Sequence, residues 1–138
     1  MARGSFFTLP SEFSTSIQTI GTATMFYDAV VAAGRKDFFD EAVACTIFAP
    51  IDAYSKGKVI IPDRHIICGF LGYSPQLLPG KTYYSIIGTP IKVTWGKDGM
   101  RRVNGIPFVQ TDVITKNGVV HLIKSVCLPL PVRTMRCD

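Results

Sequence analysis

The chain has 138 residues, a length that fits one domain with a sizeable buried core. Hydrophobic residues make up 47% and charged residues 18%, and no apolar run approaches the ~20 residues that a bilayer-spanning helix needs. The net charge of +5 favours anionic partners, but the basic residues are scattered along the chain, which argues against a nucleic-acid-binding protein.

The first residues, Met1 to Ser5, do not lead into the apolar segment of a signal peptide. We expect residues 1–13 to be an N-terminal extension that starts with a short added remnant, and a native secretion signal to have been removed from this chain. Residues 131–138 are basic and follow a proline-broken run, so we expect them to form a flexible tail.

The first third of the chain, 5–41, is predicted to be helical. Ser14 or Ser16 can cap a short helix that Gly21 ends. Thr22 is then placed to cap a second helix. The apolar stripe of this second helix falls at helical spacing and consists of Met25, Phe26, Ala29, Val30 and Ala33.

A third short helical turn over 37–43 precedes a change of periodicity. Residues 46–49 are β-like and Pro50 ends this strand, after which 51–56 can form a single helical turn, with Asp52 as its cap. Residues 65–70 are again apolar.

From residue 81 onward the pattern consists of short strands separated by turn signals. A helical first third followed by a β-rich remainder predicts the α+β class, with the strands forming a sandwich or barrel. The expected strands are 81–87, 90–95, 100–103, 108–114 and 119–126. The turn dipeptides that tolerate a positive φ are Asp98-Gly99, Asn104-Gly105 and Asn117-Gly118.

The four cysteines are Cys45, Cys68, Cys127 and Cys137, and no two have the spacing of a zinc knuckle or a redox Cys-x-x-Cys motif. An even number fits two disulfides in an oxidising compartment, with three possible connectivities. It equally fits four reduced, partly buried thiols. The sequence leaves both readings open.

Three segments follow one another in a distinctive order. The first is Thr46 to Pro50, followed by Asp52; the second is His65 to Gly69; the third runs from Asn117 to Pro129. Together they resemble the signatures of the fasciclin (FAS1) domain family over residues 17–129, with divergent microbial, fungal and plant members as the nearest in pattern. The residues expected to hold such a fold together are Thr46, Phe48, Pro50, Asp52, His65, Gly118, His121 and Pro129.

The resemblance implies a wedge-shaped β-sandwich with N-terminal helices packed along one edge, here a single domain over 14–130. It also implies an extracellular module, secreted or at the cell surface, that works in adhesion or attachment to the matrix or cell wall. No enzymatic activity or cofactor comes with the family. Arg64 stands where the family has a tyrosine, so surface motifs built on that tyrosine are not carried over to this chain.

The two histidines are the candidates for chemistry. A catalytic or metal-binding reading would combine His65 and His121 with Asp52 or Asp112. We favour a structural reading, because strand alternation places His121 between apolar neighbours on one face. We further expect His65 to hydrogen-bond the first segment. The sequence therefore predicts no catalytic residue, no metal and no cofactor.

The hairpin around residues 97–102 offers the best polar contact surface. Trp95, Lys97, Arg101 and Arg102 could grip an anionic polysaccharide by charge and ring stacking, although such a hairpin is more often a solvated edge. The predicted function is a non-catalytic adhesion or attachment module whose partner is a matrix or cell-wall protein or polysaccharide. The alternative is a carbohydrate- or lipid-binding module that uses this hairpin and the strand aromatics.

Overall fold

The computed structural model describes residues 10–126. Pro129, Cys127, Cys137 and the predicted tail lie outside the described residues. Helices come first and strands dominate the rest, so the predicted α+β class is confirmed. The helices are α1 (Phe13–Ile20), α2 (Thr24–Ala32) and α3 (Lys36–Glu41). The strands are β1 (Cys45–Pro50), β2 (Ile66–Cys68), β3 (Thr82–Tyr84), β4 (Pro90–Trp95), β5 (Arg101–Val103), β6 (Ile106–Ile114) and β7 (Gly118–Ile123), with 3₁₀ turns η2 (Asp52–Tyr54), η3 (Pro62–His65) and η4 (Ser74–Gln76) between them.

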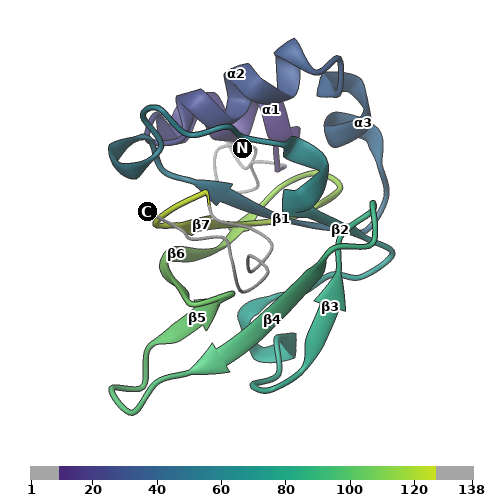
Figure 1. Ribbon diagram of the computed structural model, residues 1–138. Coiled ribbons are helices and arrows are strands. Elements are labelled where there is room, and N and C mark those ends of the chain that lie inside the picture. The colour runs from purple at the N-terminus through teal and green to yellow at the C-terminus, as the bar shows by residue number, and fades with distance from the viewer. Residues whose placement is uncertain (1–9, 127–138) are drawn as a thin grey trace, which may run out of the picture.

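The strands form one sheet in the order β2-β1-β7-β6-β5-β4-β3. β1 and β7 pair in parallel, whereas the other neighbours pair antiparallel. Figure 1 shows the helices together at one end of the molecule, over β1 and β7, with β3, β4 and β5 at the opposite end. Of the strands that the structure describes, the first therefore lies beside the last, and β2 forms an edge of the sheet.

β1 is buried on both faces, and its alternate residues serve two hydrophobic cores. Ile47 and Ala49 pack with the helices, whereas Phe48 belongs to a second core with residues of β4 and β5. The sheet thus curls so that its two halves pack face to face, as the predicted β-sandwich requires. The second core also contains Ile67, Leu77, Ile91, Val93, Val103, Ile106 and Ile123.

One phenylalanine from each helix anchors the helical layer. The rings of Phe13, Phe26 and Phe39 are fully buried, and their centroids lie 5.3 to 6.1 Å apart. Edge-on and tilted contacts of this kind add to the stabilisation that burial of the rings provides. The short helices are therefore held by packing rather than by their own helix propensity.

Several predicted boundaries required correction. Strand 90–95 coincides with β4, but the strand predicted over 81–87 is limited to β3, because a tight turn forms where Ser85 N–H donates to the Thr89 carbonyl oxygen at 2.9 Å. β6 begins earlier than predicted, because Asn104 and Gly105 adopt φ of 51° and 79° in a two-residue hairpin turn.

The prediction that Gly118 provides a positive φ in a turn is wrong, since Gly118 does not adopt the left-handed conformation and is the first residue of β7. Its lack of a side chain serves a different purpose. A Cβ atom built on Gly118 would lie 2.0 Å from the carbonyl oxygen of Cys45. Glycine is needed here because the backbones of β1 and β7 approach closely at the start of their ladder.

We predict that Gly118→Ala destabilises the domain by about 3 kcal/mol or more, because the clash is with strand backbone that cannot move aside without breaking the ladder. The matched control is Gly57→Ala. Gly57 has φ of 74° but open space around it, so only the left-handed conformation opposes the substitution, at about 1 kcal/mol. Urea denaturation of both variants measures the difference, and equal losses of stability would contradict this account.

Candidate functional site

His65 connects the turn η3 to the centre of the sheet. Its Nδ1 donates a hydrogen bond to the carbonyl oxygen of Phe48 at 2.8 Å, and its ring lies 5.4 Å from that of Phe26. Only 1% of His65 is exposed. The contact with the first segment that the sequence predicted is present, and the ring is closed off from any substrate.

His121 is fully buried in β7 and uses both ring nitrogens. Nε2 donates to the carbonyl oxygen of Gly72 at 2.6 Å, and Nδ1 accepts the backbone N–H of Asp112 at 3.1 Å. A ring that donates at one nitrogen and accepts at the other is neutral. The ring also stacks on those of Phe108 and Phe48, with centroid distances of 5.4 and 5.7 Å.

Burial disfavours the charged form of both imidazoles. It lowers the pKa of His65 to about 4, against the opposing effect of the hydrogen bond to Phe48. Burial likewise lowers the pKa of His121, although the bond to Gly72 works in the other direction. Both rings are therefore neutral at physiological pH, and act as hydrogen-bonding parts of the core.

Asp52 caps a helix that lies well before it in the chain. Its carboxylate accepts the N–H groups of Thr24 at 3.2 Å and Met25 at 2.8 Å, and the Thr24 hydroxyl at 2.7 Å. The prediction that Thr22 caps α2 is wrong: Ala23 is the N-cap residue. The prediction that Asp52 caps its own turn is also wrong, because the N-cap of η2 is Ile51 and Asp52 instead supplies the acceptor for α2.

The residues of the catalytic alternative thus serve different purposes in different places. Asp52 caps α2, His65 holds Phe48, and His121 bridges Gly72 and Asp112. Among residues 10–126, no group of three histidine, cysteine or acidic side chains is arranged to hold a metal ion.

The predicted hairpin surface lies on β4, β5 and the turn between them. The Arg101 guanidinium stacks 4.7 Å from the Trp95 ring centroid and donates from Nη1 to the Ser74 carbonyl oxygen at 2.6 Å. Arg102 pairs with Asp98 at 3.2 Å, whereas Lys97 is exposed. The structure brings Trp95 and Arg101 together, but both arginines already have partners within the domain.

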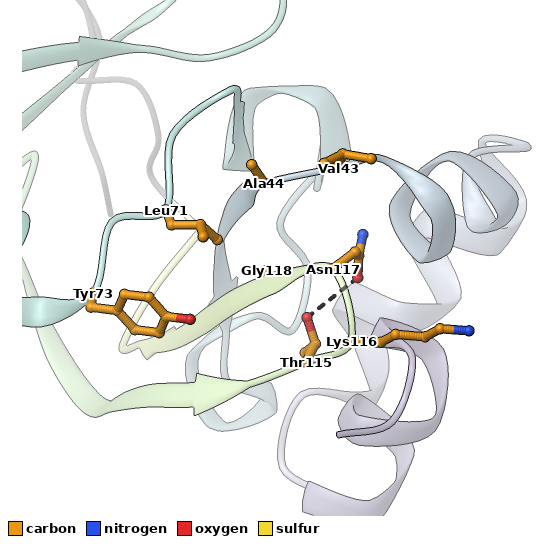
Figure 2. Close-up of a pocket in the computed structure, with 8 residues that line it drawn as sticks. All are labelled: Val43, Ala44, Leu71, Tyr73, Thr115, Lys116, Asn117 and Gly118. Carbon is orange, nitrogen blue, oxygen red and sulfur yellow. Dashed lines mark hydrogen bonds between the residues drawn. The ribbon is translucent and has the colours of Figure 1, made fainter. Parts of the chain in front are cut away.

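A groove that sequence reasoning missed lies beside the start of β1 and β7 (Figure 2). Its volume is about 240 Å³. Figure 2 shows Leu71 and Tyr73 at one side, with Val43 across from them and the Lys116 side chain extending away from both. Val43 is 80% and Leu71 39% exposed. The full lining consists of Val43, Ala44, Leu71, Tyr73, Thr115, Lys116, Asn117 and Gly118.

Residues from the three segments that resemble the fasciclin signatures position the walls of this groove. The Thr46 hydroxyl donates to the Phe70 carbonyl oxygen at 2.6 Å and accepts the N–H of Gly72 at 2.7 Å, and His121 holds the Gly72 carbonyl. On the other side, the Asn117 amide donates to the carbonyl oxygens of Phe39 and Ala42 at the end of α3. The groove is therefore built on rigid support, although its lining comes from loops.

Comparison with protein-family models matches residues 60–129 to the Fasciclin domain. This match covers half of the chain and contains the second and third recognised segments. The chain belongs to the fasciclin family. No curated protein matches it.

The residues that precede the matched range complete the fasciclin domain. The first segment lies outside residues 60–129, yet it pairs with β7 along the whole of β1, from Cys45 opposite Gly118 to Pro50 opposite Ile123. Fasciclin domains are known as adhesion-related modules that are generally extracellular or surface-associated. In the described part of this chain, no helix is long and apolar enough to span a membrane.

We predict that His65→Ala lowers the melting temperature by roughly 10 °C, because it leaves the Phe48 carbonyl without its donor and opens a cavity beside Phe26. His65→Asn is the matched variant, since its amide nitrogen can take the place of Nδ1. Calorimetry should place His65→Asn between the wild type and His65→Ala. A melting temperature of His65→Ala equal to that of the wild type would show that the hydrogen bond contributes no stability.

The pH dependence of stability provides a separate test of His65. Because its pKa falls from 6.5 to about 4 on folding, the unfolded chain takes up the proton first as pH decreases. The contribution of neutral His65 is therefore complete above pH 6.5 and is lost between pH 6.5 and 4, by on the order of 3 kcal/mol. The free energy of unfolding of the wild type and of His65→Asn, measured by denaturation at several pH values over this range, should converge toward low pH. A difference in free energy of unfolding that stays constant with pH would exclude a lowered pKa of His65.

Proposed function

We propose that this fasciclin domain is a non-catalytic module, secreted or carried at the cell surface, that attaches to matrix or cell-wall material. The observation that carries the proposal is the state of the two histidines. His65 and His121 are closed into the core and bonded to backbone groups, so neither can exchange a proton with a substrate. Membership of an adhesion-related family supports the same function.

The groove beside β1 and β7 is the contact surface that we favour. Val43 and Leu71 present exposed apolar side chains, and Lys116 contributes to the lining. This chemistry fits a protein segment that inserts an apolar side chain against Val43 and Leu71. The net charge of +5 favours the approach of an acidic partner. We therefore propose a matrix or cell-wall protein as the partner of this groove.

The alternative surface is the β4–β5 hairpin. Trp95 is 49% exposed and Lys97, two residues later in the chain, is exposed as well, as a sugar-stacking site would need. The engagement of Arg101 with Ser74 and of Arg102 with Asp98 leaves less charge for a ligand. For this reason we place polysaccharide or lipid binding second.

An array of matrix proteins, cell-wall proteins and polysaccharides tests the proposal. We predict that the domain binds a protein on the array, and that Val43→Ser combined with Leu71→Ser weakens the binding roughly tenfold by removing apolar contact. The matched control is Val59→Ser combined with Ile87→Ser, which changes two exposed apolar residues that do not line the groove and should leave binding unchanged.

Two other outcomes would change the proposed binding surface or overturn the proposed function. Salt-sensitive binding to polysaccharide that Lys97→Ala and Arg102→Ala weaken would favour the hairpin alternative. Failure of the domain to bind any matrix or cell-wall component would overturn the proposed function.

A further inference from the structure

Two of the four cysteines face each other across neighbouring strands. Cys45 in β1 is the register partner of Cys68 in β2, and their Sγ atoms lie 2.8 Å apart. This separation is within 1 Å of the ~2.05 Å of a disulfide bond. Cys45 is buried, whereas Cys68 is exposed to solvent.

The strand geometry favours a bond between the two side chains. The backbone N–H of Cys45 donates to the carbonyl oxygen of Asn117 at 3.2 Å, so the polar backbone groups of Cys45 face β7 and not β2. Cys45 and Cys68 are therefore a non-hydrogen-bonded pair, in which the Cα atoms approach to ~4.5 Å. This distance lies within the range of about 4.4 to 6.8 Å that disulfides span, so bonding needs no rearrangement of the strands.

The pair stands at the base of both walls of the groove. Val43 and Ala44 directly precede Cys45, and the chain that leads to Leu71 directly follows Cys68. The Phe70 N–H donates to the Ala44 carbonyl oxygen at 2.9 Å, which is the next backbone link between the two walls. A covalent bond at the cysteines would thus hold these walls at a fixed separation.

We propose that Cys45 and Cys68 form a disulfide that joins the edge strand β2 to β1 and fixes the walls of the groove. The bond itself does not depend on what the domain binds. Only its effect on binding rests on the proposed function. The sequence left three connectivities open, and the structure assigns the one that pairs these two cysteines.

Oxidised glutathione is a sufficient oxidant. The exposed Cys68 reacts first, since burial raises the pKa of the Cys45 thiol to about 12. The Cys68 thiolate attacks one sulfur of oxidised glutathione, whose S–S bond breaks and releases one glutathione thiolate. Cys45 then loses its proton and attacks Sγ of Cys68, which releases the second glutathione. Two protein thiols are oxidised and one glutathione disulfide is reduced to two thiols.

Peptide mapping of the full chain tests the bond directly. After incubation with oxidised glutathione, free thiols are alkylated and the protein is digested with trypsin without reductant. Cys45 lies in the peptide of residues 37–56 and Cys68 in that of residues 65–81, each with a single cysteine. We predict a linked species of these two peptides, lighter by two hydrogens than their sum. Recovery of residues 37–56 in alkylated form, or linked to a peptide that contains Cys127 or Cys137, would overturn the proposal.

A melting experiment isolates the pair from the other two cysteines. In the variant Cys127→Ser with Cys137→Ser, dithiothreitol should lower the melting temperature by roughly 10 °C, because reduction frees residues 46–67 from a closed loop. Adding Cys68→Ser should abolish this response to dithiothreitol. If the double variant melts at the same temperature with and without reductant, the bond is absent or does not constrain the fold, and the proposal fails.

Binding on the array then separates this inference from the proposed function. If the linked peptides are found and the oxidised domain binds more tightly than the reduced one, both stand. If they are found and no array component binds, the disulfide stands and the function fails.

Discussion

The parallel ladder between β1 and β7 joins the first strand within residues 10–126 to the last, and the rest of the domain is arranged around it. The two strands can approach because Gly118 has no side chain to meet the carbonyl oxygen of Cys45. β1 and β7 then form the shared wall of two cores, one with the helices and one with β4 and β5. A parallel pair must be closed by a long crossover, and here most of the domain lies between its two strands.

The polar residues of the recognised segments act as internal connections. His65 joins η3 to β1, Asp52 joins η2 to α2, and His121 joins β7 to the loop at Gly72. His65 and His121 satisfy backbone groups that would otherwise be buried without a partner, at a cost of about 1–3 kcal/mol apiece, whereas Asp52 accepts the N–H groups at the more exposed start of α2. This explains why such residues can identify a family without naming a ligand: they specify the fold, and the surface remains free to vary.

The local sequence pattern was sufficient to predict some elements and not others. Alternation and the Asn104-Gly105 turn defined β4 and the hairpin that opens β6, because both depend on neighbouring residues. The capping of α2 by Asp52 and the contact of Gly118 with Cys45 depend on residues far apart in the chain. No periodicity encodes such contacts, so the sequence placed these residues in the right segments and gave them the wrong local roles.

The groove was missed for the same physical reason, and its origin shows how the fold bears on function. Its lining comes from loops before β1, after β2 and before β7, which become neighbours only when the sheet assembles. Thr46 and His121 hold one of these loops from within the core. Residues that seem purely structural in the sequence therefore determine the shape of an exposed surface. A substitution at Thr46 would act on binding through the loop it holds, even though its own side chain never reaches a partner.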